Sequence, residues 1–309
     1  MIGYEGQAVV VTGAGRGLGR LYAMDLARRG AAVVVNDLGG SMTGDGVDSR
    51  VADDVVREIH AAGGVAVASY DSVETPDGGK AIIERALEEF GRLDAVVSNA
   101  GIFHTAPFDE LTSDDWQRML RVHLDGAFNL SQPAYRHMKD KGYGRFVFIA
   151  SSAGLFGQPN SAHYAAAKAG TVGLANVIAI EGADHGILAN CVLPFGYSRM
   201  VFETVGDRAD LEPDPGFLHA IEPHLVVPIV VYLASEANTL SHHNFSACAG
   251  RFARVFVGLS DGWVAGSGAA RTAEDIAENL DSVTAAEPYT IPGSIFDEVA
   301  SVCSQLGIV

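Results

Sequence analysis

The chain has 309 residues, of which 48% are hydrophobic, so it is long enough to bury a large core. Acidic side chains outnumber basic ones by 38 to 21, and the net charge of −17 disfavours nucleic acid or an anionic membrane as a partner. The longest apolar stretches, such as residues 225–234, are well short of the roughly 20 residues that a membrane span needs.

Cys191, Cys248 and Cys303 lie far apart in the sequence and form no C-x-x-C pair. This spacing matches neither a disulfide framework nor a zinc site, and it is typical of a reducing compartment. The adjacent His242 and His243 have no matching carboxylate or cysteine pattern, so no metal is expected. Since a predicted strand occupies the place of a signal peptide and the last three residues are not a peroxisomal address, we expect a cytoplasmic protein.

The first third of the chain alternates apolar runs with helical patterns. Strands are predicted at residues 8–11, 32–36, 65–70 and 95–97. Helices are predicted from the glycine turn after the first strand to residue 29, at 48–62 and at 80–90, with a glycine-rich excursion at 38–46.

The same alternation continues to residue 258. Helices are predicted at 114–138, 164–181 and 223–235, and strands at 145–150, 188–193 and 255–258. Residues 197–222 interrupt the pattern with prolines, glycine and charges, which is typical of a substrate loop. The acidic tail carries two further helical patterns, at 272–280 and 295–306.

This order predicts an α/β fold, a Rossmann-type doubly wound parallel sheet with helices on both faces. We expect one domain over residues 1–265, with the substrate loop at about 197–222, followed by a C-terminal extension over 266–309. In such folds ligands bind beyond the carboxyl ends of the strands.

The turn after the first strand carries Gly13, Gly17 and Gly19, with Arg16 and Leu18 between them. These glycines permit a tight turn and a close approach to a pyrophosphate, which the helix N-terminus attracts. A plain structural loop is the alternative, but the flanking strand and helix favour cofactor binding.

Asp37 closes the second predicted strand, where a carboxylate accepts hydrogen bonds from the adenosine ribose and repels a 2′-phosphate. The position indicates NAD as the cofactor. Arg16 gives the opposite signal, because an arginine in the turn can bind a 2′-phosphate, but it can equally be a solvated charge; we rank Asp37 above it.

Tyr164 and Lys168 are spaced i, i+4, so both project from one helix face, and Ser151 ends the preceding strand. A phenol is a poor base at neutral pH, but a nearby ammonium and a positive nicotinamide both stabilise the phenolate. Tyr164 can then take the proton of an alcohol as hydride leaves its carbon.

Together these motifs resemble the short-chain dehydrogenase/reductase family. The matching residues are Thr12-Gly13-x-x-x-Gly17-x-Gly19, Asp71, Asn99-Ala100-Gly101, Ser151, Tyr164-x-x-x-Lys168 and Pro194-x-Gly196. The resemblance implies that Asp71 and Ser72 contact adenine and that Asn99 holds its strand and the cofactor ribose. It further implies that Ser151 orients the substrate oxygen, that Lys168 also binds the nicotinamide ribose, and that the segment of Gly196 and Ser198 meets the carboxamide.

One position departs from the family. Where the family usually has an asparagine that holds a water of the proton relay, this chain has His123. The histidine either holds that water or is satisfied by neighbouring backbone, and the sequence leaves both readings open.

A narrower group is similar at more positions, the (3R)-hydroxyacyl-CoA dehydrogenase units of peroxisomal multifunctional enzymes type 2, also called 17β-hydroxysteroid dehydrogenase type 4. The similar segments are 15–20, 35–40, 70–73, 121–124, which includes His123, 173–176, 179–182 and 198–200. The resemblance implies NAD-dependent oxidation of a 3-hydroxyacyl-CoA in fatty-acid or sterol side-chain β-oxidation. No hydratase or lipid-carrier portion is present, so we expect the dehydrogenase standing alone.

Two rival functions stay open. Phe195, Tyr197 and the insertion at 210–216 would reshape the pocket for a steroid or another lipophilic alcohol, and a catalytically silent NAD-binding regulator is the alternative of another class. A CoA ester would need cations near the mouth of the site, for which Arg199, Arg208 and His224 are candidates or plain solvated charges. The family resemblance also implies a homodimer or homotetramer formed through helices 114–138 and 164–181.

Overall fold

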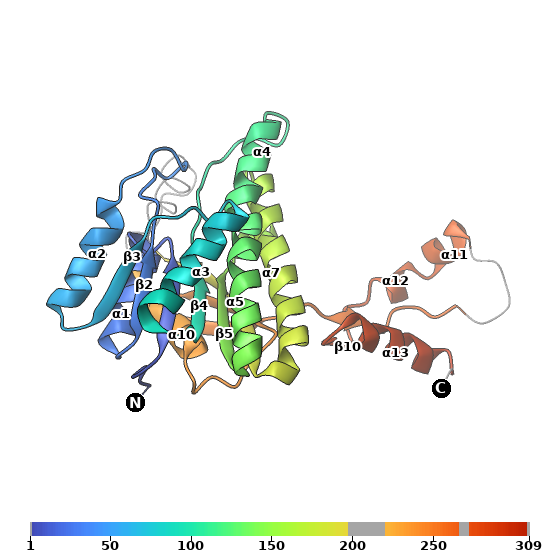
Figure 1. The fold of residues 1–309 in the computed structure, drawn as a ribbon. Helices are drawn as coiled ribbons and strands as arrows, with labels where there is room; N and C mark the ends of the chain where they lie inside the picture. Colours follow the sequence, from blue (N-terminus) through green and yellow to red (C-terminus); the bar gives the residue numbers. More distant parts are fainter. Residues whose placement is uncertain (1, 197–219, 266–271, 308–309) are drawn as a thin grey trace. The chain divides into compact units, whose positions relative to one another are not determined.

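A computed structural model describes residues 2–196, 220–265 and 272–307 (Figure 1). The chain divides into two compact units, Met1–Arg254 and Val255–Val309. In the part of the chain described, no helix is both long and apolar enough to cross a membrane.

The larger unit is built on an eight-stranded sheet in the order β3-β2-β1-β4-β5-β6-β7-β8. The strands are β1 (Ala8–Thr12), β2 (Ala32–Asn36), β3 (Val65–Ser69), β4 (Ala95–Ser98), β5 (Gly144–Ile149), β6 (Ile187–Phe195), β7 (His243–Cys248) and β8 (Arg251–Val255). β1 to β7 pair in parallel, and the order reverses between β1 and β4. This confirms the doubly wound parallel sheet and puts the switch point, where such folds bind ligands, beyond β1 and β4.

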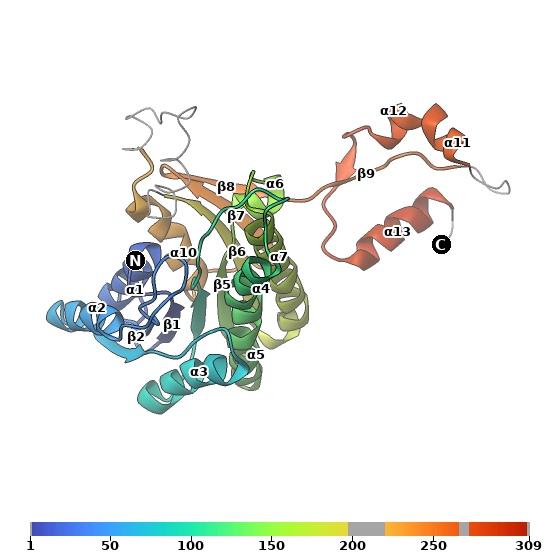
Figure 2. The ribbon, with the colours of Figure 1, turned by 90° about the horizontal axis from the view of Figure 1, so that it is seen from above.

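Helices cover both faces of the sheet (Figure 2). One face carries α1 (Gly17–Arg28), α2 (Arg50–Ala61) and α10 (Val227–Ala234), and the other carries α3 (Pro76–Phe90), α5 (Gly126–Lys141) and α7 (Ala162–Gly182). The shorter elements are α4 (Ser113–Leu120), a π-helical turn (Arg121–Asp125), α6 (Ser152–Phe156) and 3-10 turns at Ala183–His185 and Pro223–Val226. The single helix expected over residues 114–138 is therefore two helices with a π turn between them.

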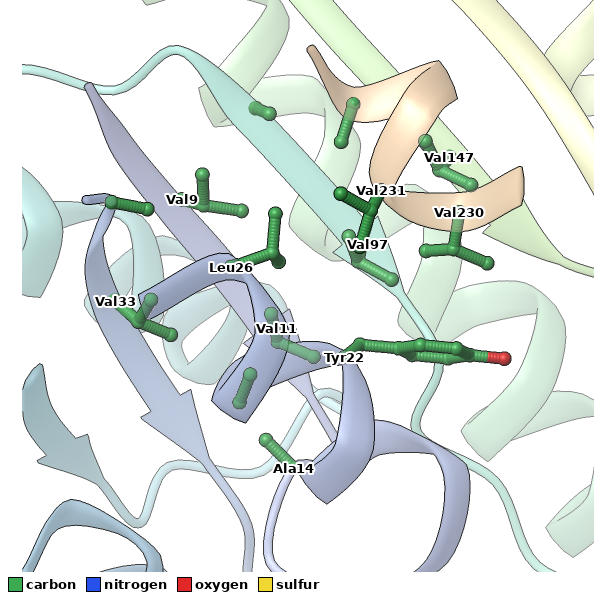
Figure 3. Packing of buried hydrophobic residues seen from close by; sticks show 14 of the residues in the cluster. Val9, Val11, Ala14, Tyr22, Leu26, Val33, Val97, Val147, Val230 and Val231 are labelled. Atoms are coloured by element: carbon green, nitrogen blue, oxygen red, sulfur yellow. The ribbon is translucent and has the colours of Figure 1, made fainter. Parts of the chain in front are cut away.

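The two layers follow from the alternation of side chains along each strand. Val9 and Val11 of β1 belong to the core under α1, α2 and α10, whereas Val10 belongs to the core under the other three helices. Figure 3 shows the first of these cores, where Tyr22 and Leu26 of α1 pack among the strand valines. Because both faces are covered, the central strands read as unbroken apolar runs.

The prediction of the last strand at residues 255–258 is wrong. The sheet continues instead with β7, His243–Cys248, in which three of the six residues are polar and most are half-buried. Ala249 and Gly250, with φ of 52° and 74°, then turn the chain into β8. A two-residue turn with two positive φ angles is typical of a tight hairpin. Residues near the sheet edge need no apolar run, so hydrophobicity did not mark them.

The smaller unit contains the helices α11 (Ala273–Glu278), α12 (Leu280–Val283) and α13 (Ile295–Gln305). Its two short strands, β9 (Leu259–Ser260) and β10 (Tyr289–Thr290), pair in antiparallel fashion. The helical patterns expected at 272–280 and 295–306 correspond to these helices. The expected domain boundary at residue 265 stays a prediction.

Close helix packing beside the sheet gives a first test. A Cβ added to Gly79 of α3 would lie 2.4 Å from the carbonyl oxygen of Asn129 in α5. We expect Gly79→Ala to lower the free energy of unfolding by about 1–3 kcal/mol, the usual penalty of overpacking, although alanine is the better helix former. Urea unfolding followed by circular dichroism measures the change, and an unchanged or higher stability would show that α3 and α5 can separate without penalty.

Candidate active site

A cavity of about 830 Å³ opens at the switch point of the larger unit, within the range of roughly 300–1,000 Å³ that is usual for ligand pockets. The structure brings nearly all predicted site residues to its wall. They are Gly13, Arg16, Gly17, Leu18, Gly19, Asp37, Asp71, Ser72, Asn99, Ala100, Gly101, His123, Ser151, Tyr164, Lys168 and Gly196.

Four other candidates do not join this wall. Ser198, Arg199 and Arg208 lie outside the described residues. His224 borders a separate surface pocket, where its Nδ1 lies 2.9 Å from Oε2 of Glu222. Of the three cations considered for a CoA ester, the structure therefore places only His224, and it places it away from the cavity.

Hydrogen bonds between the ends of β1 and β4 fix the position of the glycine turn. The hydroxyl of Thr12 accepts hydrogen bonds from the backbone N–H groups of Asn99 and Ala100, each at 3.0 Å. In return the Asn99 amide donates to the carbonyl oxygens of Thr12 and Gly13, at 2.9 and 3.1 Å. A Cβ on Gly19 would lie 2.1 Å from the Gly13 oxygen, so only glycine permits this approach. The expected strand-holding role of Asn99 thus has a geometric basis.

The N-terminus of α1 fits a pyrophosphate. Among the described residues, no side chain caps this end and no acidic residue lies in its first turn. Its first N–H groups and positive dipole end therefore face the cavity with no carboxylate of the helix's own first turn beside them. Arg16, the residue just before the helix, donates from Nη1 to the carbonyl oxygen of Gly40 at 2.9 Å.

Asp37 lies beside this turn and organises two loops. Its Oδ2 accepts from the backbone N–H of Gly15 at 2.8 Å, and its Oδ1 accepts from that of Gly39 at 2.7 Å. Each carboxylate oxygen keeps a further lone pair, so Asp37 can still accept hydrogen bonds from ribose hydroxyls. Gly15 was not among the predicted site residues. Its backbone N–H holds Asp37, and a side chain there would not fit, because a Cβ would lie 2.3 Å from Cγ1 of Val51.

The predicted catalytic residues meet across the cavity from this turn. Ser151 caps α6, where its Oγ accepts from the Ala153 N–H at 3.2 Å, and it also hydrogen-bonds to the Tyr164 side chain. Lys168 is buried, and its Nζ donates to the carbonyl oxygen of Ile149 at 2.6 Å. The same Nζ lies 5.7 Å from the centroid of the Tyr164 ring.

Burial governs the protonation of these groups. It raises the pKa of Tyr164, against a smaller lowering by the Ser151 hydrogen bond, and it lowers the pKa of Lys168 to about 8. Without a cofactor, the pKa of the Tyr164 phenol therefore lies above its ordinary value. A phenolate buried at this position therefore needs compensating positive charge nearby.

His123 lies in the π-helical turn, a distortion that often marks functional sites. Its Nε2 is 2.7 Å from the carbonyl oxygen of Ile102 and 3.2 Å from the N–H of the same residue. Its buried Nδ1 has no hydrogen-bond partner among the described residues. Burial and the charge of Lys168 lower the pKa of His123 well below its ordinary value, so the ring is neutral. One nitrogen thus engages backbone, and the other has no hydrogen-bond partner among the described residues.

Two neighbours fix the position of the His123 ring. It packs edge-on against Tyr164, with centroids 5.2 Å apart and planes at 88°. A Cβ on Gly101 would lie 2.4 Å from Cε1 of His123, so the glycine makes room for the ring. Phe103 contacts Tyr164 in the same edge-on way, at 5.2 Å. Phe103 was missed in the sequence, where its place shortly after Asn99-Ala100-Gly101 was the only signal.

The wall beyond Tyr164 is largely apolar. Ile102 and Phe103 form a buried cluster with Tyr164, and Phe156 and Pro159 continue the wall beside α6. A reactive hydroxyl can therefore reach Ser151 and Tyr164 while an apolar body lies against these side chains.

Comparison with known proteins agrees with this geometry. Residues 7–206 match the family model described as short chain dehydrogenase. Peroxisomal multifunctional enzyme A of Dictyostelium discoideum is 38% identical over 305 residues, 99% of this chain and 66% of that protein.

Two solved structures are similar. Full-length peroxisomal multifunctional enzyme type 2 from Drosophila melanogaster matches with a TM-score of 0.82 and 31% identity, over 99% of this chain and 50% of that one. A 7α-hydroxysteroid dehydrogenase complexed with NADH and 7-oxo glycochenodeoxycholic acid matches with a TM-score of 0.71 and 25% identity, over 80% and 95% of the two chains. This chain thus covers 66% of the Dictyostelium protein and 50% of the Drosophila structure, so it spans only part of each.

Proposed function

The chain belongs to the short-chain dehydrogenase family, and we propose that it oxidises a 3-hydroxyacyl-CoA to a 3-ketoacyl-CoA with NAD. As a member of this family it is an oxidoreductase that acts on CH–OH groups. The observation that carries the proposal is the meeting of Ser151, Tyr164 and Lys168 with the glycine turn around one cavity. The likeness to peroxisomal multifunctional enzymes supports an acyl-CoA of fatty-acid or sterol side-chain β-oxidation as the substrate.

NAD(H) is the cofactor that the cavity residues fit. The uncapped N-terminus of α1 would hold the pyrophosphate, and Asp37 would accept from the adenosine ribose and repel a 2′-phosphate. Asp71 and Ser72 would contact adenine, Asn99 the ribose, and the segment of Gly196 and Ser198 the carboxamide. The similar 7α-hydroxysteroid dehydrogenase is complexed with NADH.

Bound NAD supplies the hydride acceptor and a positively charged ring. The chain's own residues then handle the proton. Ser151 would donate a hydrogen bond to the substrate oxygen, and Tyr164 would remove the hydroxyl proton as general base. Burial raises the pKa of this phenol, so the Lys168 ammonium and the nicotinamide charge are both needed to stabilise the phenolate.

We further propose that His123 holds the relay water that an asparagine holds elsewhere in the family. Its Nδ1, which has no partner among the described residues, would bind that water. The charge of Lys168 is near enough to lower the pKa of the His123 ring, so the water would lie on the side of the relay. Since the ring is neutral, it would orient the water without itself changing charge.

A hydroxysteroid or another lipophilic alcohol is the second candidate substrate. The apolar wall of Phe103, Phe156 and Pro159 suits either an acyl chain or a ring system, and a hydroxysteroid dehydrogenase is among the similar structures. A catalytically silent regulator is disfavoured, because it would have no need for Ser151, Tyr164 and Lys168 together.

The proposal extends to assembly and location. We expect a homodimer or homotetramer formed through the helical regions 114–138 and 164–181, with a small molecule rather than nucleic acid as ligand. The cytoplasmic location expected from the sequence stays a prediction, and the relatives carry peroxisomal names.

A spectrophotometric screen at 340 nm tests the substrate. NAD and NADP are compared in parallel against 3-hydroxyacyl-CoAs of graded length, sterol side-chain CoA esters and free hydroxysteroids. We expect turnover of a CoA ester with NAD preferred, because Asp37 repels a 2′-phosphate. Turnover of free steroids alone would overturn the acyl-CoA assignment, and a preference for NADP would overturn the role of Asp37.

Tyr164→Phe tests the acid–base role. We expect turnover to fall by about a hundredfold or more, the usual contribution of general acid–base catalysis, while NADH binding stays near the wild-type level. Steady-state kinetics and NADH fluorescence titration measure the two effects. Tyr135→Phe on α5, outside the cavity wall, is the matched control and should keep full turnover.

His123→Asn and His123→Leu separate a water-holding ring from a packing one. Asparagine can hold a water, so we expect it to keep most of the kcat, whereas leucine should lower kcat by about tenfold or more. Rates are compared at equal stability, established by thermal melting of both variants. A leucine variant with wild-type kcat would show that the ring only packs against Tyr164.

A further inference from the structure

The connection between β2 and α2, residues 38–48, crosses the wall of the cavity, and we call it the strap. It starts beside Asp37, and its residues Gly40, Ser41, Met42 and Gly44 line the cavity. Met42 packs against the cluster that contains Phe103 and Tyr164. The strap therefore spans from the predicted ribose site to the predicted catalytic residues.

Three contacts fasten the strap along its length. The first is the hydrogen bond from Arg16 in the glycine turn to the carbonyl oxygen of Gly40. In the second, the N–H of Phe103 donates to the carbonyl oxygen of Met42 at 3.0 Å. The third is an ion pair at the tip, where Nη2 of Arg118 on α4 donates to Oδ1 of Asp45 at 2.6 Å.

The tip of the strap is a small ordered turn that presents Asp45 to α4. The backbone N–H of Ser41 donates to the carbonyl oxygen of Asp45 at 2.8 Å, and the Ser41 Oγ accepts from the Asp45 N–H at 3.0 Å. The Thr43 hydroxyl donates to Oδ2 of Asp45 at 2.7 Å. A Cβ on Gly44 would lie 2.9 Å from Cγ2 of Ile102, so the turn lies directly against the cavity wall.

The ion pair lies apart from the cavity that it helps to shape. Neither Asp45 nor Arg118 lines the cavity, whereas their neighbours Met42 and Gly44 do. The side chains of Arg118 and Asp45 are 38% and 66% exposed, so salt can screen the pair. The pair can therefore act on a ligand in the cavity through the position of the strap.

We propose that Asp45 and Arg118 are a positioning pair that fastens the strap over the cofactor and thereby raises the affinity for NADH. An unfastened strap is free to move away from the cavity, and binding then has to pay the entropy of ordering it. The inference rests on the proposed function in its choice of cofactor. It adds a determinant of cofactor affinity that lies outside the binding wall and responds to ionic strength.

A double-mutant cycle on the full chain tests this pair. The Kd of NADH is measured by fluorescence titration for the wild type, Asp45→Asn, Arg118→Gln and the double variant, at low and high salt. An exposed ion pair contributes at most about fivefold to an equilibrium constant, so we expect each single variant to bind NADH two- to fivefold more weakly. The two losses should not add, and the double variant should bind NADH no more weakly than either single variant. Added salt should weaken binding to the wild type more than to the variants.

The control is Lys80→Ala, which removes another exposed ion pair, with Glu84 at 3.1 Å on α3, away from the cavity wall. It should leave the Kd of NADH and its salt dependence unchanged. Thermal melting excludes unfolding as the cause of a weaker Kd. Additive losses, or variants that bind NADH as the wild type does, would overturn the strap proposal; a wild type that binds no NADH at all would instead overturn the proposed cofactor.

Discussion

The junction of β1 and β4 is the contact on which the site depends. At this point the sheet order reverses, and Thr12 and Asn99 exchange hydrogen bonds across the gap between the two strand ends. These bonds satisfy backbone groups that would otherwise be buried without partners. With the gap held open, the glycine turn can leave β1 on one side and the loop to Phe103 can leave β4 on the other. The cavity opens between these two loops, and the strap, α6 and α7 add to its wall.

Burial is the second constraint, and it changes the pKa values of the side chains in the site. Tyr164, Lys168 and His123 are all buried. Burial raises the pKa of Tyr164 and lowers the pKa values of Lys168 and His123, and each shift favours the neutral form of the side chain. In the proposed mechanism, Tyr164 is neutral in the protein alone, and the positive nicotinamide would help the Lys168 ammonium, whose pKa is lowered to about 8, to stabilise the phenolate. Under this proposal, proton removal would depend on the bound cofactor, which suits a hydride transfer that needs its acceptor.

The strands that are buried on both faces could be predicted from the sequence, whereas the strands near one edge of the sheet, β7 and β8, could not. The central strands carry unbroken valine runs because both faces meet helices, and the sequence located them closely. β7 was missed because half of its side chains are polar and most are only half-buried. The π turn was missed as well, because periodicity does not register one extra residue in a long helical stretch.

The sequence by itself determined the glycine turn, Asp37 and the set of Ser151, Tyr164 and Lys168. The glycines share one turn, Tyr164 and Lys168 share one helix face, and Asp37 and Ser151 each follow a predicted strand. Only the tertiary structure decided what surrounds them. The contact of Gly101 with His123, that of Phe103 with Tyr164 and that of Asp45 with Arg118 join elements far apart in the chain. Such contacts follow from how helices and loops pack over the sheet, and packing of this kind leaves no periodic signal in the sequence.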